Sequence, residues 1–219
     1  MSIGNPVLQN ILDELRERRP DLEACVPAVT EAFEALAATY DNGGKLLLCG
    51  NGGSHADALH IAGELCKSFE RKRPLPPKFM HKLVKQPGGE ALAAHLERGL
   101  PAITLGLNGA LKTAVENDSP LRNLAFAQET YALIKPEDTL LAISTSGNAR
   151  NCLFAMSVAN AMEATTVALT GSHGGAMAPA AAIAIKAPGD SVKTIQEAHI
   201  ALYHTLSALI EAHYFPHRR

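Results

Sequence analysis

The sequence is poor in several features that mark particular classes of protein. It has no tryptophan and only 5% aromatic residues. No apolar stretch of 18 residues is free of charge and turn signals, so no membrane-spanning helix is predicted. The first residues, MSIGNPVLQNILDEL, lack the basic and then apolar regions of an export signal. We therefore expect an unexported protein with no membrane partner.

Cysteine pairs at metal-binding spacing are also absent. The four cysteines are Cys25, Cys49, Cys66 and Cys152, and none of them forms a CxxC motif. Cys49 and Cys152 lie in apolar runs, where small buried thiols are common. Reduced cysteines and a cytoplasmic location are the expectation.

Charge of one sign is not in excess. Lysine and arginine total 20 against 22 acidic residues, so the overall charge indicates neither nucleic acid nor an anionic membrane. Between Lys67 and Lys85, however, seven basic residues accompany a single acid, Glu70. We interpret this segment as a solvated face, with an anion-binding patch as the alternative. This pattern does not favour nucleic-acid binding, because Phe69 and Phe79 are the only aromatic residues interleaved there.

What the sequence does contain is an alternation of strand-like and helix-like segments. The 219 residues, 47% of them hydrophobic, suffice for one substantial core. Residues 1–43 predict a helical N-terminal region of two helices, interrupted at Pro20. Buried strands are predicted at 45–50, 102–106, 139–144, 165–171 and 181–188. Helices are predicted at 54–69, 109–134, 149–163, 174–179 and 192–214. The alternation favours an α/β fold with a five-stranded parallel sheet between two helical layers, forming a single domain over 1–219.

One segment interrupts this alternation. Residues 74–101 are rich in proline and lysine and separate the first helix of the α/β region from the second strand. We interpret them as an insertion, in the form of a helical hairpin. Such a connection serves as a lid, an interaction surface or a peripheral decoration.

Two loops follow predicted strands and open predicted helices. In the first, Asn51, Gly52, Gly53 and Ser54 follow the apolar run KLLLCG. Glycine lets the backbone approach an anion, and a helix N-terminus supplies amide donors. The second loop, Ser144, Thr145, Ser146, Gly147 and Asn148, offers three consecutive hydroxyl groups. Together the loops favour a phosphorylated small molecule over helix caps alone, although one or two of the hydroxyl groups are also suited to capping.

Two helices carry candidate ligands and acid–base groups. His60 and Glu64 are four residues apart and share a helix face, which suits one divalent ion but is also common on solvated helices. The C-terminal segment IQEAHIALYHTL carries Gln196, Glu197, His199 and His204. Histidine in an apolar helix is more often a satisfied core residue than a ligand.

Taken together, these motifs resemble the SIS (sugar isomerase) domain family, and within it the phosphoheptose isomerases. The resemblance rests on CGNGGSHADALHIAGEL, END, ISTSGN, LTGSHGG and IQEAHIALYHTL, which occur in the family's order. It implies conversion of sedoheptulose 7-phosphate to glycero-manno-heptose 7-phosphate. The implied catalytic pair is Glu64 and His204. The implied substrate contacts are Asn51, Gly52, Gly53, Ser54, Glu64, Asn117, Asp118, Ser144, Thr145, Ser146 and Gln196.

The resemblance also implies a zinc ion and a homotetramer with active sites built from more than one subunit. The implied zinc ligands are His60, Glu64, Gln196 and His204. Gln196 and His204 are eight residues apart, which is about 12 Å along a continuous helix. They could therefore share an ion only if their side chains reach toward each other, the helix is disrupted, or different subunits supply them.

The sequence departs from the family at three places. Ala149 replaces a serine that commonly follows STSGN, and Arg150 lies beyond it. Lys193 stands where some heptose isomerases carry an aspartate, although Asp190 is nearby. The insertion is the third departure. These changes leave open an alternative function, a non-catalytic SIS protein that binds a phosphosugar as a sensor or binds a protein such as a replication initiator.

Overall fold

The computed structural model describes residues 5–216 and contains one five-stranded sheet. Its strands are β1 (Leu46–Cys49), β2 (Ala102–Thr104), β3 (Thr139–Ser144), β4 (Thr165–Gly171) and β5 (Ile183–Ala187). The strand order is β2-β1-β3-β4-β5, and every neighbouring pair is parallel. The predicted parallel sheet is therefore confirmed, with strand ends within two residues of the predicted ones.

Both faces of the sheet are buried, as the continuous apolar strands predicted. In β1, Leu46 and Leu48 belong to one hydrophobic cluster, whereas Leu47 and Cys49 belong to another. Successive side chains of a strand point to opposite faces, so an all-apolar strand needs a helical layer on each side. This requirement gives the fold its three layers.

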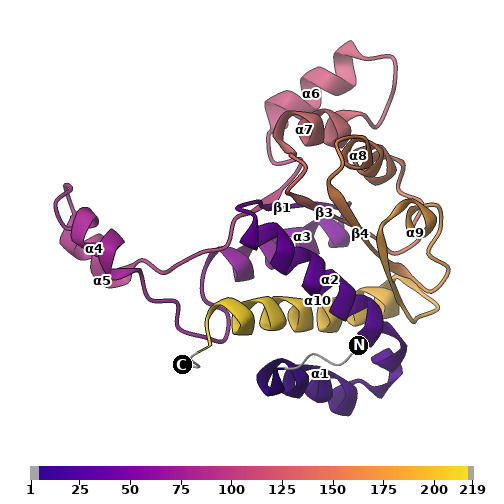
Figure 1. Ribbon diagram of the computed structural model, residues 1–219. Helices are drawn as coiled ribbons and strands as arrows, with labels where there is room; N and C mark the ends of the chain where they lie inside the picture. The colour runs from indigo at the N-terminus through magenta and orange to yellow at the C-terminus, as the bar shows by residue number, and fades with distance from the viewer. Residues whose placement is uncertain (1–4, 217–219) are drawn as a thin grey trace.

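The two helical layers lie below and above the sheet in Figure 1. The lower layer contains α1 (Pro6–Arg18), the 3-10 helix η1 (Pro20–Cys25), α2 (Val26–Asp41), α3 (Gly53–Cys66) and α10 (Val192–Tyr214). The upper layer contains α7 (Ala125–Leu133), α8 (Arg150–Ala161) and α9 (Met177–Ala180). Within the described residues, no helix combines the length and apolar character needed to cross a membrane.

Capping signals set the ends of the main helices. Asn5 accepts a hydrogen bond from the Val7 amide at the start of α1, where Pro6 occupies the first turn. Ser191 and Thr194 form a capping box at the start of α10. Pro20 separates α1 from α2 as predicted, and a 3-10 helix fills the connection.

The segment predicted as helical over 109–134 consists of two helices. Between α6 (Gly109–Asp118) and α7, the chain turns at 119–124. Pro120 lies in that turn, and Asn123 adopts a φ of 69°. A proline and a left-handed asparagine are both typical of chain reversal, so the break has a local cause.

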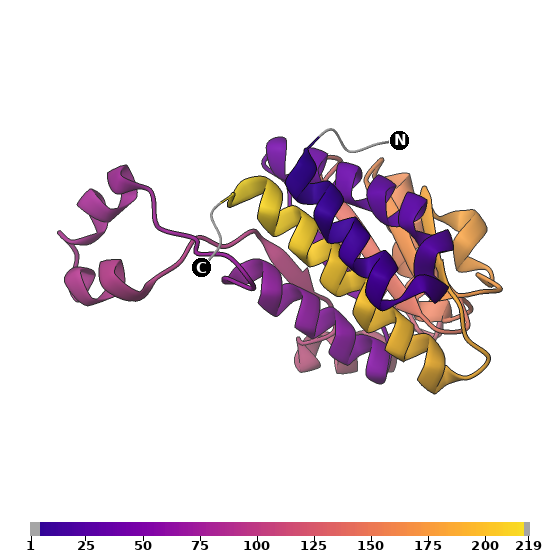
Figure 2. The same cartoon turned by 90° about the horizontal axis from the view of Figure 1, so that it is seen from below.

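The insertion forms a helical hairpin, as predicted. We call residues 74–101 the arm; it contains α4 (Pro77–Leu83) and α5 (Gly89–His95). Figure 2 shows the arm extending away from the sheet and its helical layers. A Cβ atom on Gly89 would lie 1.9 Å from the Leu83 carbonyl oxygen, so the tight turn between the two helices requires glycine there.

Candidate active site

The two polar loops meet at the point where the path of the chain from strand to strand reverses direction across the sheet. The chain passes from β1 to its neighbour β2 at one edge and then returns to β3 on the other side of β1. In an open parallel sheet, the crevice at the carboxyl ends of two such strands is the usual ligand site. The loops after β1 and β3 therefore lie together at this crevice, and we call them the cradle (residues 50–54 and 144–148).

The first half of the cradle opens α3 and approaches α10 closely. Gly52 has a φ of 54°, which favours glycine. A Cβ atom on Gly53 would lie 2.1 Å from Gln196 Nε2. Gly53 therefore allows the Gln196 amide to lie directly against the N-terminus of α3. Ser54 is buried behind it.

The second half of the cradle holds the three hydroxyl groups. Ser144 is buried at the end of β3, and its Oγ lies 3.5 Å from Ser146 Oγ. Ser146 Oγ also accepts a hydrogen bond from the Asn148 amide. A Cβ atom on Gly147 would lie 2.1 Å from the Gly174 carbonyl oxygen, so this loop packs tightly on the loop after β4.

A pair of asparagine side chains joins the two halves of the cradle. Asn51 Nδ2 donates to Asn151 Oδ1 at 2.9 Å, and Asn151 Nδ2 donates back to Asn51 Oδ1 at 2.8 Å. Sequence reasoning missed Asn151, because no spacing rule links a residue of α8 to a loop 100 positions earlier. The pair fixes the two loops relative to each other.

A hollow of about 260 Å³ lies beside the second loop. The polar side chains that line it include Thr145, Ser146, Ser172, His173, Asp190 and Ser191. Ser172 and His173 come from the LTGSHGG motif but were not predicted as site residues. Asp190 lines the hollow although it is not at the family's aspartate position. Arg150, by contrast, lies over the Phe154 ring at 5.0 Å, so its guanidinium is engaged on α8.

The predicted acid–base and ligand residues of α3 and α10 converge on one carboxylate. Glu64 Oε1 lies 3.3 Å from His60 Nε2 and 3.2 Å from His204 Nε2. The side chain of Glu64 is 6% exposed, whereas those of His60 and His204 are 52% and 36% exposed. A buried carboxylate thus lies against two partly exposed imidazole rings.

Burial shifts the titration of this group toward neutrality. Desolvation raises the pKa of the Glu64 carboxyl to about 7. Desolvation, followed by the nearby charge of His60, lowers the pKa of His204. Glu64 can therefore exchange a proton near pH 7 beside a His204 that is favoured in its neutral form, which suits general acid–base chemistry.

The same three residues fit a divalent metal ion. Both Glu64 carboxylate oxygens and His204 Nε2 are buried and lack a hydrogen-bond partner among residues 5–216. The ligand atoms of His60, Glu64 and His204 all lie within 4.8 Å of one another. Ligand atoms about 2.0–2.1 Å from a tetrahedral zinc are about 3.3–3.4 Å apart, which matches the two contacts of Glu64 Oε1.

Gln196 does not join this cluster within one chain. Helix α10 is continuous from Val192 to Tyr214, so the possibility of a disrupted helix is excluded. The Gln196 amide lies against Gly53, at the cradle end of α3, whereas His204 lies at Glu64. The structure therefore brings three of the four predicted metal ligands together and places the fourth at the cradle.

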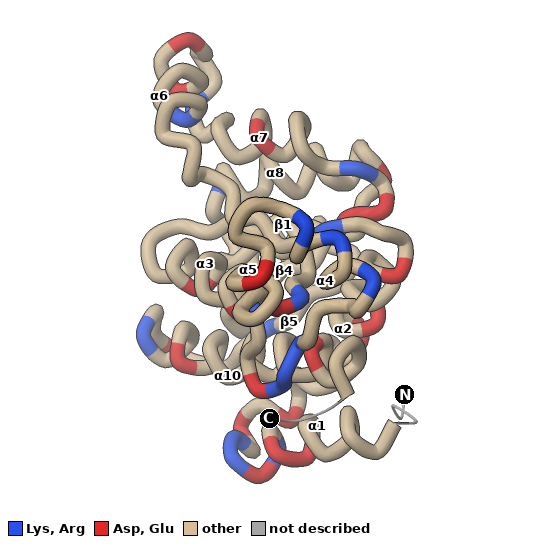
Figure 3. The backbone as a smooth tube through the Cα atoms, turned by 90° about the vertical axis from the view of Figure 1, so that its left-hand side faces the viewer, with Lys and Arg blue, Asp and Glu red and all other residues tan. Residues whose placement is uncertain are grey.

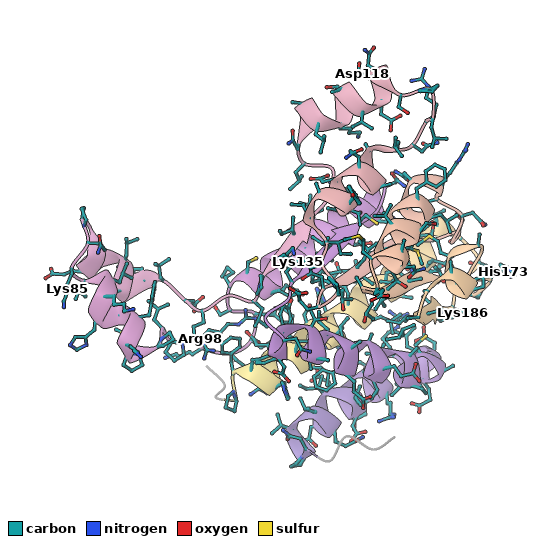
Figure 4. The ribbon with its side chains drawn as sticks, turned by 45° about the horizontal axis from the view of Figure 1, so that its top comes forward. Lys85, Arg98, Asp118, Lys135, His173 and Lys186 are labelled. Carbon is teal, nitrogen blue, oxygen red and sulfur yellow. The ribbon has the colours of Figure 1, made fainter. Side chains whose placement is uncertain are left out.

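Asn117 and Asp118 also lie apart from the cluster. They are exposed at the end of α6, which packs on α7, and Figure 4 shows Asp118 at the outer end of that helix. Among the described residues, Asn117 Nδ2 donates to Asp118 Oδ1, and no hydrogen bond joins either side chain to the cradle.

The basic segment from Lys67 to Lys85 is not one solvated face. Lys72, Lys78, Lys82 and Lys85 are exposed, and Figure 3, which looks toward the arm, shows basic positions on α4. Arg71 and Arg73, however, are only 2% and 1% exposed. Arg73 Nε lies 2.9 Å from Glu211 Oε1 of α10. The interpretation as a solvated face is therefore wrong for the two arginines.

Known proteins provide an independent comparison. Two models described as "SIS domain" match residues 10–100 and 122–210. A phosphoheptose isomerase of Geotalea daltonii is 35% identical over 193 residues, covering 88% of each chain. One of Helicobacter pylori is 34% identical over 212 residues, covering 97% of each.

A solved structure shows the same likeness. The phosphoheptose isomerase of Neisseria gonorrhoeae matches with a TM-score of 0.69 and 28% identity, covering 95% of this chain and 99% of the other. The motifs, the parallel sheet with its cradle and these relatives agree with one another. The chain belongs to the SIS domain family, among the phosphoheptose isomerases.

Proposed function

We propose that this chain is an aldose–ketose isomerase that converts sedoheptulose 7-phosphate to glycero-manno-heptose 7-phosphate through an enediol. The observation that supports it most is the meeting of His204 with Glu64 on α3, the helix that the first loop of the cradle opens. Moving a proton between C1 and C2 needs a base, an acid and stabilisation of a developing oxyanion. The relatives named phosphoheptose isomerase support the choice of sugar.

Glu64 is the proposed base. Its pKa of about 7 lets the carboxylate accept the proton from one carbon and return it to the next at neutral pH. His204, with a lowered pKa, is proposed to exchange protons with the sugar oxygens. The neutral imidazole can both donate and accept, which an enediol step requires.

The cradle is the proposed phosphate and sugar site. Asn51, Gly52, Gly53 and Ser54 offer amides and one hydroxyl at the N-terminus of α3, where the helix dipole favours an anion. Ser144, Thr145 and Ser146 offer hydroxyl donors from the neighbouring strand. Gln196, which lies against Gly53, is proposed to contact the sugar between the cradle and Glu64.

A zinc ion is the proposed cofactor. His60, Glu64 and His204 would hold it, and the buried, unpaired atoms of Glu64 and His204 support this assignment. When bound, such an ion polarises a carbonyl or hydroxyl oxygen of the substrate. We further propose a homotetramer in which the partner copy supplies Gln196 as a fourth ligand and Asn117 and Asp118 as substrate contacts.

We also propose that residues 1–219 act as a single SIS domain in the cytoplasm. One sheet receives strands from both segments that match the family models, which supports a single unit. The described part of the helical N-terminal region, α1 to α2, packs under that sheet, and the insertion at 74–101 leaves the sheet uninterrupted. The four cysteines are free, as expected in a reducing compartment.

The test is turnover of sedoheptulose 7-phosphate by purified full-length protein, with and without zinc. Glu64→Gln should abolish turnover, a loss of at least about 10²–10⁴-fold, because the amide cannot accept the proton. Glu34→Gln, at an exposed position of α2, is the matched control and should retain full activity. Absence of turnover across a panel of C5 to C7 sugar phosphates would contradict the proposal.

The exposed arm favours a second candidate, a non-catalytic phosphosugar sensor or protein-binding regulator. The arm carries Lys78, Lys82 and Lys85 together with exposed apolar side chains, and Ala149 removes one phosphate-binding hydroxyl. Thermal stabilisation by sugar phosphate without turnover would support the sensor. No response to sugar phosphate or zinc would support the protein-binding role.

A further inference from the structure

Tyr203 connects the candidate metal cluster to a buried acid that plays no part in the proposed chemistry. It precedes His204 on α10 and is 2% exposed. Its hydroxyl oxygen lies 2.9 Å from His60 Nδ1 and donates to Asp57 Oδ1 at 3.4 Å. Asp57 lies one turn before His60 on α3, so a carboxylate, a phenol and an imidazole follow one another in a line.

One assignment of the protons makes both contacts of the Tyr203 hydroxyl group hydrogen bonds. Asp57 is 8% exposed, and as a carboxylate it can only accept. If the phenol gave its single proton to His60, the carboxylate would face a bare oxygen, at the cost of an unsatisfied buried charge. If the phenol donates to Asp57 Oδ1, His60 Nδ1–H donates to the phenol oxygen, and both contacts of the Tyr203 hydroxyl group are hydrogen bonds.

This arrangement places the second nitrogen of His60 as a ligand. With the proton on Nδ1, Nε2 carries a lone pair, and it points toward Glu64 Oε1 at 3.3 Å. A metal-binding histidine needs this neutral tautomer, and its other nitrogen is usually held by a hydrogen bond of this kind. The Nε2 lone pair of His60 then belongs to a group of ligand atoms, with those of Glu64 and His204, that lie within 4.8 Å of one another.

We propose that Tyr203, supported by Asp57, is a positioning residue that keeps the proton of His60 on Nδ1 and so presents Nε2 to a divalent metal ion. This inference rests on the proposed function, because it deepens the assignment of the metal site. The competing explanation is that Tyr203 is a packed aromatic residue. Its ring does meet His60 and His204 edge to face, with centroids 5.5 and 5.0 Å apart.

Tyr203→Phe separates the two explanations, because it keeps the ring and removes the hydroxyl. Zinc affinity of the full-length protein is measured by competition with a chromogenic chelator. Loss of a hydrogen bond behind a metal ligand typically weakens binding by about 10–100-fold, which is the expected effect. Zinc affinity equal to that of the unmodified protein would overturn the proposal.

Tyr214→Phe is the matched control. Tyr214 also lies on α10, and its hydroxyl oxygen is 2.8 Å from each of two acceptors, the Ala37 carbonyl oxygen and Asp41 Oδ1. Removing this hydroxyl should leave zinc affinity unchanged. Asp57→Asn provides a second variant should Tyr203→Phe fold poorly. Its neutral amide is a weaker acceptor for the phenol, so a smaller loss of affinity is expected and an unchanged affinity would count against the proposal.

The tautomer itself is measured on metal-free protein by nitrogen-15 NMR above pH 8, where imidazole is neutral. His60 should be protonated on Nδ1 in the unmodified protein and mixed in Tyr203→Phe. Protonation on Nε2 in the unmodified protein would overturn the proposal. Neither measurement uses a sugar phosphate, so their failure leaves the isomerase proposal standing, and an absence of turnover leaves them unaffected.

Discussion

Charged side chains are usually exposed and large apolar ones buried, and two regions of this protein break that rule in opposite ways. They are the packed surface between α3 and α10 and the exposed arm. Where α3 packs on α10, Glu64, Glu211 and the adjoining Arg73 are charged or titratable groups that lie inside the protein. On the arm, large apolar side chains lie outside, namely Phe79, Met80, Val84, Leu92 and Leu96. A charged group inside a protein needs a partner or a chemical role. Large apolar side chains stay exposed where the element that carries them is too small to enclose a core.

The buried charges at the end of α3 are closely matched by partners. Glu211 accepts hydrogen bonds from the amides of Phe69 and Glu70 and from Arg73. Arg73 also donates to the carbonyl oxygens of Glu64 and Leu65, the last turn of α3. A cation at a helix C-terminus is favourable, so Arg73 stabilises the helix that carries the active-site residues.

The two helices of the arm, in contrast, bury very little. Helices of seven residues are marginal by themselves, and of the residues in α4 and α5 only Gly89 is buried. The arm is fastened at its base, where it joins the rest of the protein and the backbone amide of Arg98 donates to the Arg73 carbonyl at 2.8 Å. The guanidinium groups of Arg73 and Arg98 lie over Phe215 at 4.8 and 4.9 Å. Figure 4 shows Arg98 at this base and Lys85 far out on the arm.

Arg73→Met should produce the largest change in stability. It leaves Glu211 buried without its cation, which typically lowers the free energy of unfolding by about 3–5 kcal/mol. Lys72→Met, at the exposed neighbouring position, should change it by less than about 0.5 kcal/mol. Urea unfolding at fixed protein concentration measures both. Equal effects of the two substitutions would remove the distinction between buried and exposed charges of this segment.

The second effect depends on pH and concerns Glu64 in protein freed of metal by a chelator. Its pKa of about 7 in the folded state lies above the ordinary value of 4.5, so the folded state binds this proton more tightly than the unfolded state. The stabilisation of the folded state by this proton is fully present below pH 4.5, declines as the pH rises and is lost by about pH 7. It amounts to about 3 kcal/mol. Melting temperatures from pH 5 to 8 should fall for the unmodified protein.

Glu64→Gln supplies the comparison for that pH series. The amide does not titrate, so the decline between pH 5 and 8 should flatten, whereas Glu34→Gln should follow the unmodified protein. Excess zinc should also flatten or reverse the decline, because a metal ion favours the ionised carboxylate. If Glu64→Gln left the pH dependence of the melting temperature unchanged, that dependence would belong to another titratable group.

Removal of the arm should have the smallest effect. Replacing residues 77–95 with a short Gly-Ser linker deletes side chains that are mostly exposed, so little apolar burial is lost. The free energy of unfolding should change by less than about 1 kcal/mol in the same urea assay. A loss of several kcal/mol would show that the arm contributes to the stability of the fold, contrary to the exposure of its side chains.

Local patterns were sufficient to predict the five strands, the cradle and the hairpin form of the arm. Each of these depends on neighbours in sequence, such as an apolar run followed by Gly-Gly or by three hydroxyl residues. The break between α6 and α7 was also signalled locally, by Pro120 and Asn123, but the helical periodicity on either side obscured it.

Residues whose roles depend on distant partners could not be predicted. Arg73 is read as a surface cation until Glu211, 138 positions later, is placed beside it. Tyr203 fits the apolar pattern of α10 and gains a partner only when α3 packs against that helix. The separation of Gln196 from His204 was foreseen from helix geometry alone, because that distance is local.

The hydrogen bond between Arg98 and Arg73 has a practical consequence for engineering. Because the chain leaves and re-enters the folded body at adjacent points, the stretch between them can be lengthened without moving β1 or β2. The turn at Lys85–Gly88 is exposed and lies at the far end of this closed loop. It is a suitable position for a fluorescent reporter or an affinity tag placed inside the chain, remote from the cradle.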